Sequence, residues 1–268
     1  MIIAVDTGAT KTLIAGFNQS GEPGETHKFE TPDDQFEYTQ KLLEVLHSNY
    51  KPKDIDAIVV AVPGIVKKNK VLWCGNLPWK DFDLGGALEP HYDCPIGIGN
   101  DADLAGLAEA NLLDPIPELC VYVTISTGVG CGLVINGKLE PALTRTEAGH
   151  MMLGTVSNLK EWEDFASGHA IKEKYDKYAY DITDDEAWKD IAINIGRGLV
   201  VLIPLLQPDI VVVGGSIGTH FPHYKKYLRD WVEETIPSGI IHPKIVQAEH
   251  PQEAVIYGCY YYAIRHLS

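Results

Sequence analysis

Two stretches of the chain share one pattern of hydrophobic and polar positions. Residues 2–6 and 13–17 are largely apolar and β-branched, and the polar turn Asp6–Thr12 lies between them. Residues 121–137 repeat the arrangement around a glycine-rich turn. Short apolar runs bounded by turn residues are typical of strands. We therefore predict a strand–turn–strand unit in each place and an internal duplication of the fold.

The rest of the pattern alternates helices with strands. Apolar residues at helical spacing predict helices over residues 34–49, 84–92, 101–110, 187–206, 223–235 and 253–266, with a helix start within 162–171. Continuous apolar runs predict strands over 55–62, 95–99 and 245–248, and a strand from 210 that leads into a glycine-rich turn ending at 218. We predict a loop over 72–79, irregular chain over 175–186 and a linker over 111–118, which lacks periodicity. The alternation indicates an α/β protein.

Composition and charge then narrow the class of protein. The 268 residues suffice for one large domain or two of ordinary size. A net charge of −15 argues against nucleic-acid binding, which needs clustered Lys and Arg, but leaves an anionic substrate open. No apolar run reaches the length of a membrane span, and the N-terminus lacks the basic region of a signal peptide. The scattered cysteines form no CxxC pair, which favours a reducing cytoplasm over a disulfide framework or a zinc site.

The stretch from residue 95 to residue 110 is a short strand followed by a helix rich in Ala and Leu, with Asn100 and Asp101 at the junction. In α/β folds, ligands bind outside the carboxyl ends of the strands. Asp101 could accept a proton from a substrate hydroxyl, and Asn100 could hold that substrate. The alternative is that the pair only caps the helix, since Asn and Asp are preferred there.

Both polar turns could face a phosphate. The first carries Asp6, three threonines, Gly8 and a lysine, and backbone N–H groups in such turns can bind anions. Asp6 could also reach a phosphate-bound Mg²⁺, directly or through water. In the second turn, Gly128, Gly130 and Gly132 beside Thr127 permit close approach of a ligand. The alternative in each case is an ordinary hairpin turn.

Three further polar residues have simple structural interpretations. Glu147 and His150 are three residues apart, as in a solvated surface pair, and no third ligand at a recognisable spacing supports a metal site. Glu163 lies in or near a first helical turn, where the helix dipole favours acids. Gly258 falls inside a predicted helix, where it costs about 1 kcal/mol against alanine, so we expect a packing or ligand reason for it.

Several of these signals occur as an ordered series. The series reads Asp-x-Gly-x-Thr-Lys, x-Pro-Gly, Asn-Leu-Pro-Trp, Asn-Asp-Ala, Thr-Gly-x-Gly-x-Gly, Glu-x-Gly-His, Glu-x-x-x-Ser-Gly and Gly-Gly-Ser. It resembles the ROK family (repressors, open reading frames, kinases) of bacterial sugar kinases, and its glucokinase-like members most. The resemblance spans residues 2 to 262, nearly the whole chain.

The resemblance implies the actin-like ATPase (ribonuclease H-like) fold, in which two duplicated α/β domains close on a cleft. We expect an N-terminal domain over 1–112, with the C-terminal helix 253–268 packing back on it, and a C-terminal domain over 119–252. It implies Asp101 as the catalytic base. It also implies sugar contacts from Gly64, Asn76, Asn100, Asp101, Glu147, His150 and Glu163.

The resemblance implies a nucleotide site as well. The residues implied to hold phosphate are Asp6, Gly8, Thr10, Lys11, Thr127, Gly128 and Gly130, while Gly214 and Gly215 would flank the nucleotide. Asp6 would bind Mg²⁺, directly or through water. The cofactors implied are ATP and Mg²⁺, and family members suggest a homodimer in the cytoplasm, with neither nucleic acid nor membrane as partner.

The sequence departs from the family pattern in one place. Many members carry a Cys-x-Cys-Gly-x-x-Gly-Cys-x-Glu zinc motif after Glu-x-Gly-His, but residues 151–162 hold no cysteine. We therefore expect no zinc site, and something else must position His150 and Glu163. The sequence also shows no helix-turn-helix segment ahead of the first strand, so we expect a member outside the repressor branch.

The activity implied is the transfer of the terminal phosphoryl group of ATP to a hexose, with glucose and its 6-hydroxyl as first choice. Three alternatives stay open: a kinase for fructose, mannose or N-acetylmannosamine, a polyphosphate-dependent glucokinase, and a sugar sensor without catalysis.

Overall fold

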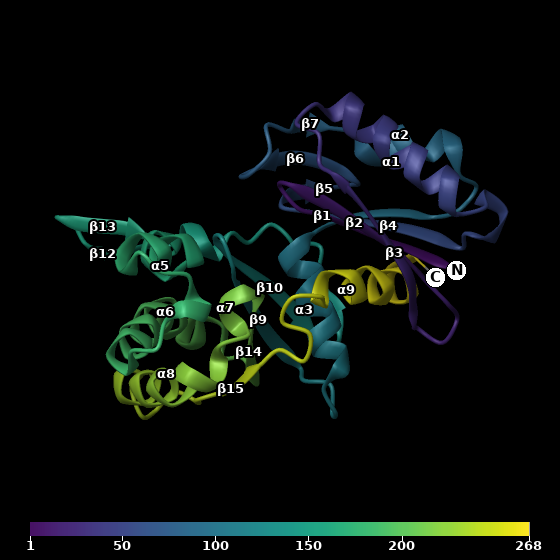
Figure 1. The fold of residues 1–268 in the computed structure, drawn as a ribbon. Coiled ribbons are helices and arrows are strands. Elements are labelled where there is room, and N and C mark those ends of the chain that lie inside the picture. Colours follow the sequence, from purple (N-terminus) through teal and green to yellow (C-terminus); the bar gives the residue numbers. More distant parts are fainter. Residues whose placement is uncertain (268) are drawn as a thin grey trace.

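Two five-stranded sheets organise the chain into two lobes, which meet along two central helices (Figure 1). This arrangement comes from a computed structural model, which describes residues 1–267. The purple and blue N-terminal lobe carries the first sheet, and the green C-terminal lobe carries the second. The domain boundaries given above stay a prediction.

The first sheet has the order β3-β2-β1-β4-β8. β1, β2 and β3 pair antiparallel, whereas β4 and β8 run parallel to β1. The strands are β1 (Ile2–Thr7), β2 (Lys11–Phe17), β3 (Pro23–Glu30), β4 (Ala57–Val62) and β8 (Ile96–Asn100). Every residue of β4 is buried, as expected for a central parallel strand covered on both faces.

The second sheet repeats the first in order and direction, as β11-β10-β9-β14-β15. Its strands are β9 (Leu119–Ile125), β10 (Val129–Ile135), β11 (Lys138–Leu139), β14 (Ile210–Gly214) and β15 (Lys244–Gln247). β9 and β10 pair antiparallel, and β14 lies parallel between β9 and β15. The predicted internal duplication is therefore confirmed in strand order and in pairing.

Two small sheets extend from the lobes. One contains β5 (Gly64–Lys67), β6 (Lys70–Cys74) and β7 (Lys80–Phe82), and the other is the hairpin β12 (Met152–Thr155) and β13 (Asn158–Glu161). The predicted loop over 72–79 is thus wrong at its start, because residues 72–74 belong to β6. A turn at Lys68 and Asn69, both with positive φ, reverses the chain and lets β6 pair with β5. Asn76 lies outside these strands.

Helices pack on the two large sheets, some on their outer faces and others between the sheets. They are α1 (Gln35–Asn49), α2 (Leu84–Leu88), α3 (Asp101–Leu112), α4 (Glu163–Ala166), α5 (Gly168–Tyr175), α6 (Asp185–Leu206), α7 (Gly215–Gly218), α8 (Phe221–Thr235) and α9 (Ala254–Tyr262), which continues as a π-helical turn, Ala263–Leu267. α1 and α2 share one apolar core with the first sheet, and α6 and α8 share another with the second.

Local sequence explains where several helices begin. Side chains of Asp34, Ser167 and Asp184 accept backbone N–H groups at the starts of α1, α5 and α6. The predicted helix start over 162–171 is therefore two helices, because Ser167 ends α4 and caps α5. The glycine-rich turn after β14 is wound into the short helix α7, which the sequence did not predict.

A third core lies between the two sheets and is built on α3 and α9. It joins Ala4 and Val59 of the first sheet to Tyr122 and Val212 of the second, with Leu104 of α3 between them. Residues 102–110 of α3 are all buried, which accounts for the Ala- and Leu-rich sequence without a polar face. α3 thus contacts both lobes, and Figure 1 shows it beside the yellow α9 at their junction.

Two details fix α3 in this position. Gly258 of α9 approaches so closely that a Cβ atom there would lie 1.9 Å from the carbonyl oxygen of Leu104. This is the packing reason expected for a glycine inside that helix. At the other end of α3, the buried Glu109 carboxylate accepts the backbone N–H groups of Glu249 and His250, at 2.7 and 2.9 Å.

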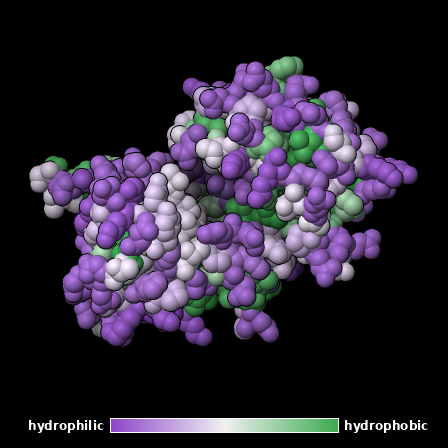
Figure 2. Space-filling view, viewed as in Figure 1, coloured by the Kyte–Doolittle hydropathy of each residue, from purple (hydrophilic) through white to green (hydrophobic). Residues whose placement is uncertain are grey.

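Figure 2 shows a mainly polar surface over both lobes, with a hollow where they meet. Apolar residues are scattered on this face and gather mostly near the junction. Within residues 1–267, every helix is too short or too polar to cross a bilayer.

The contact between α3 and α9 gives the first testable prediction. Gly258→Ala should lower the free energy of unfolding by at least about 2 kcal/mol, because the new methyl group meets a backbone carbonyl that cannot move without displacing α3. Urea unfolding followed by circular dichroism measures the change. The control is Gly239→Ala, where a Cβ would meet no atom within 4 Å. Equal stability of the two variants would contradict the packing described.

Candidate functional site

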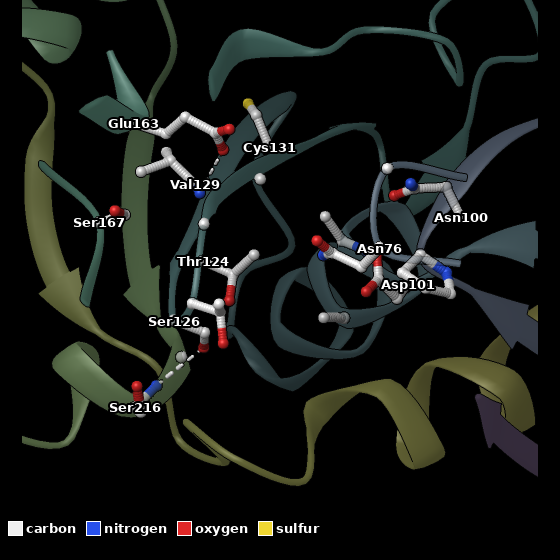
Figure 3. Close-up of a pocket in the computed structure, with 18 of the residues that line it drawn as sticks. Asn76, Asn100, Asp101, Thr124, Ser126, Val129, Cys131, Glu163, Ser167 and Ser216 are labelled. Carbon is white, nitrogen blue, oxygen red and sulfur yellow. Dashed lines mark hydrogen bonds between the residues drawn. The ribbon is translucent and has the colours of Figure 1, made fainter. Parts of the chain in front are cut away.

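A cavity of about 880 Å³ lies between the lobes, within the size range of small-molecule sites. We call it the interlobe cavity. The carboxyl ends of the parallel strands β1, β4, β8, β9 and β14 all reach it, which is where α/β folds bind ligands. Figure 3 shows Asn76, Asn100 and Asp101 on one side and Thr124, Ser126 and Glu163 on the other.

Most of the residues proposed from the sequence line this cavity. They are Asp6, Gly8, Gly64, Asn76, Asn100, Asp101, Thr127, Gly128, Gly130, Glu147, His150, Glu163 and Gly215. Residues more than 200 positions apart in the chain therefore share one space, and both lobes contribute to it.

Three of the proposed residues do not line the cavity. Thr10 and Lys11 lie on the exposed side of the first turn, where their backbone carbonyls accept N–H groups from Thr31 and Gly8. Gly214 is buried against the ring of Tyr122, whose hydroxyl would lie 2.2 Å from a Cβ atom at that position. In this conformation Gly214 serves packing, and its neighbour Gly215 faces the cavity.

The structure separates the roles of Asn100 and Asp101. Asn100 is the N-cap of α3: its Oδ1 accepts the N–H of Asp103 at 3.0 Å, and its Nδ2 donates to the Gly64 carbonyl at 3.1 Å. Asp101 is therefore not needed as the cap. One of its oxygens accepts the N–H of Ala102 at 2.8 Å, which holds the carboxyl group at the first turn of the helix. The backbone N–H of Asp101 itself also bonds this carboxyl group, but no side chain of residues 1–267 donates to it, so the group remains open to a ligand in the cavity.

Burial makes the acids of the cavity unusually weak. It raises the pKa of Asp101 to about 7, and the negative charges of Asp6 and Glu147 add to this effect. Burial also raises the pKa of Asp6 to about 6 and raises the pKa of Glu147. A carboxyl group with a pKa near 7 is suited to accept a proton at neutral pH.

The second polar turn is contacted by Glu163. Its Oε2 accepts the N–H of Val129 at 3.3 Å and lies 2.7 Å from where a Cβ of Gly128 would be. A side chain at Gly128 would therefore displace the Glu163 carboxylate. Nearby, Ser126 Oγ accepts the N–H of Ser216 at 3.1 Å, which joins this turn to the start of α7 (Figure 3).

His150 is held by an acid that the sequence did not suggest. Its Nδ1 lies 2.8 Å from Glu161 Oε2 at the end of β13 and 3.9 Å from Glu163 Oε1. Across the cavity, the ring of Trp73 meets the His150 ring edge to face at 6.2 Å. Among residues 1–267, His150, Glu161 and Glu163 form the one cluster of His, Cys, Asp or Glu side chains that could share a metal ion, and it holds no cysteine.

The lining of the cavity is acidic. It includes Asp6, Asp101, Glu147, Glu163, Asp164 and Glu173, and among the described residues neither Lys nor Arg contributes to it. An anionic ligand would therefore need a cation of its own. Asp6 is suited to hold a hard divalent cation, because no hydrogen bond from residues 1–267 compensates its buried carboxylate.

Comparison with known proteins identifies the family to which this chain belongs. The model of the ROK family matches residues 2–266. The chain belongs to the ROK family. With that match and the neighbours described next, its fold is the actin-like ATPase fold, with two duplicated halves around the interlobe cavity.

Known ROK proteins differ in activity. The xylose repressor of Bacillus subtilis (strain 168) is 27% identical over 217 residues, which cover 70% of this chain and 56% of the repressor. This chain therefore matches only about half the length of that relative. The N-acetylmannosamine kinase of Yersinia pestis (strain Pestoides F) is 27% identical over 287 residues, 96% of each chain.

A solved structure confirms the fold over nearly the whole chain. The ROK family glucokinase from Streptomyces griseus, in complex with glucose and AMPPNP, superposes with a TM-score of 0.80 at 21% identity and covers 96% of this chain and 97% of that one. Because ROK relatives include kinases and repressors, family membership alone does not determine the activity, and the residues of the cavity are the basis for assigning it.

Sequence reasoning on the ROK motifs missed several residues of the site. Trp73, Ser126 and Ser216 line the cavity, and Glu161 orients His150. Ser126 and Ser216 could have been found, since Ser126 adjoins the turn proposed for phosphate and Ser216 adjoins the glycines proposed to flank the nucleotide. Trp73 and Glu161 carry no such signal, because only the pairing of short strands brings them to the site.

The raised pKa of Asp101 predicts a stability effect. Asp101→Asn should stabilise the fold by roughly 2–4 kcal/mol at pH 8, because burying the charged carboxylate is unfavourable there. The folded pKa of about 7 lies above the ordinary value of 3.8, so protonation stabilises the wild type. The gain should therefore be largest above pH 7 and vanish toward pH 4.

Thermal and urea unfolding at pH 8 and at pH 4.5 measure this difference. The control is Asp54→Asn at an exposed position, which should change stability little at either pH. A loss of stability in Asp101→Asn at pH 8 would contradict a buried, weakly acidic Asp101.

Proposed function

We propose that this chain is a sugar kinase that transfers the terminal phosphoryl group of ATP to a hydroxyl group of a hexose, with glucose at its 6-hydroxyl as the first substrate to test. The observation that carries the proposal is Asp101. Its carboxyl group faces the interlobe cavity and is not needed to cap α3, because Asn100 does so. Burial raises its pKa to about 7.

In the proposed reaction, Asp101 is the general base. It accepts the proton of the sugar hydroxyl as that oxygen attacks the terminal phosphorus atom and ADP leaves. The residues proposed to orient the sugar are Gly64, Asn76, Asn100, Glu147, His150 and Glu163. They supply polar groups from both lobes, and fixing the sugar against the donor accounts for much of the rate in such a reaction.

The phosphate chain is proposed to lie between the two polar turns. Gly8 belongs to the first turn, and Thr127, Gly128 and Gly130 belong to the second, with Gly215 at the start of α7. Backbone N–H groups in such turns can bind phosphate oxygens. Thr10, Lys11 and Gly214 remain candidates for phosphate or nucleotide contact only if ligand binding moves them into the cavity.

The charge of the cavity supports Mg²⁺ as the cofactor, with Asp6 as the residue that would hold it. A lining with acids and without Lys or Arg would repel free ATP. When bound, Mg²⁺ would neutralise the phosphates and the charge that develops during transfer.

The catalytic proposal can be separated from sugar sensing by a direct assay. ATP-dependent phosphorylation of glucose, fructose, mannose and N-acetylmannosamine is measured by coupled ADP release, with polyphosphate as the alternative donor. Asp101→Asn should lower kcat by a factor of roughly 10²–10⁴, while calorimetric sugar affinity changes little. The exposed Asp54→Asn variant is the matched control.

Two outcomes of this assay would count against the proposal. A kcat near the wild-type value in Asp101→Asn would remove Asp101 from the chemistry. Sugar binding without transfer from either donor would favour a sensor, the activity class to which repressor relatives point.

The pH dependence of the reaction tests the same base independently. Asp101 must be ionised to accept a proton, so kcat/KM should fall about tenfold per pH unit below pH 7. The residual activity of Asp101→Asn should lose the limb near pH 7 and keep only a decline nearer pH 6, where Asp6 becomes protonated. A wild-type profile that stays flat down to pH 5 would contradict the assignment.

A further inference from the structure

The side chain that orients His150 comes from a separate segment, the β12–β13 hairpin. Glu161 is the last residue of β13 and pairs with Met152 of β12. Its backbone N–H donates to Asp164 Oδ2 at 3.0 Å, and the next residue, Trp162, is fully buried with its indole N–H donating to Asn194. The position of Glu161 is thus fixed by the hairpin on one side and by a buried anchor on the other.

The contact between Glu161 and His150 decides which ring nitrogen carries the proton. The 2.8 Å distance joins Nδ1 to a carboxylate oxygen, and a carboxylate only accepts hydrogen bonds. Nδ1 must therefore be protonated, which leaves Nε2 of the neutral ring with a free lone pair. A histidine free in water favours the opposite tautomer, with the proton on Nε2.

We propose that Glu161 is a positioning residue, which holds His150 with its proton on Nδ1 so that Nε2 accepts a hydrogen bond from a sugar hydroxyl. The identity of that ligand rests on the proposed function, whereas the hydrogen bond between His150 and Glu161 does not. Glu161 acts through His150 and has no other role in the transfer.

The neighbouring acids cannot replace Glu161. Glu163 Oε1 is 3.9 Å from Nδ1, too far for a hydrogen bond, and Oε2 of the same residue accepts the N–H of Val129. Glu147 acts on His150 only through its negative charge, because the structure of residues 1–267 has no hydrogen bond between the two side chains. The three carboxylates together raise the pKa of His150, and the hydrogen bond that Nδ1 donates to Glu161 contributes most.

A metal ion is the rival occupant of this position. His150 Nδ1 and one oxygen each from Glu161 and Glu163 lie within 4.8 Å of one another. An ion would need the Nδ1 lone pair, which the proposed tautomer uses for its proton, so the two arrangements exclude each other. Measuring the metal content of the protein together with the tautomer of His150 distinguishes the two arrangements.

The test uses the full chain labelled with ¹⁵N and long-range ¹H–¹⁵N spectra of the imidazole groups above pH 9, with His150→Gln only to assign the signals. In the wild type, His150 should be protonated on Nδ1. In Glu161→Ala it should change to the Nε2-protonated form, and its pKa should fall. In Glu161→Gln the amide oxygen can still accept from Nδ1, so this variant should keep part of the preference.

Sugar affinity supplies the second readout. The dissociation constant for glucose, or for whichever hexose the wild type binds, should rise about tenfold in Glu161→Ala and less in Glu161→Gln, with a smaller effect on kcat than on KM. Glu233→Gln, which removes an exposed acid from α8, is the matched control and should leave every readout unchanged. Circular dichroism verifies that each variant is folded.

Three results would overturn the inference: an Nε2-protonated His150 in the wild type, a tautomer that Glu161→Ala leaves unchanged, or a stoichiometric metal ion that this variant loses. The outcome is separable from that of the kinase proposal. If no hexose is phosphorylated but the tautomer depends on Glu161, the kinase proposal fails and the hold of Glu161 on His150 stands.

Discussion

The contact between α3 and α9 is the interaction on which the site depends. α3 is buried on all sides between the two sheets, and Gly258 lets α9 approach the backbone of α3 at Leu104. Asp101 is the first residue of α3, so its place in the cavity follows from the packing of this helix. Rigid secondary structure, and not a mobile loop, therefore carries the group proposed to do the chemistry.

A second constraint is electrostatic. The duplication brings the carboxyl ends of strands from both lobes to one cavity. Several acidic side chains line this cavity, and among the described residues no Lys or Arg does. Burial, and secondly the negative charges of Asp6 and Glu147, raise the pKa of Asp101 and keep it weakly acidic. The same features that suit it to the proposed role of base would disfavour a bare phosphate chain in the cavity. The proposal of a divalent cation thus rests on the protein's own charges.

The sequence allowed most of the fold and much of the site to be predicted, because the signals involved are local. Apolar runs identified the strands of both large sheets except β3 and β11, and glycine-rich turns identified both sides of the cavity. What escaped prediction depends on tertiary pairing. The absence of cysteines from residues 151–162 was plain, but the partner that Glu161 provides for His150 follows only from the register of an exposed hairpin. Likewise, nothing in the residue types of Thr10 and Lys11 indicates that they face away from the cavity.

The most direct measurement of the central claim is a crystal structure of the Asp101→Asn variant with glucose, Mg²⁺ and AMPPNP. The account predicts the 6-hydroxyl of the sugar at about 3 Å from the side chain of residue 101. It also predicts the terminal phosphate on the far side of that hydroxyl, toward the turn at Thr127–Gly130. A sugar bound elsewhere, or a residue 101 whose side chain touches neither ligand, would contradict it.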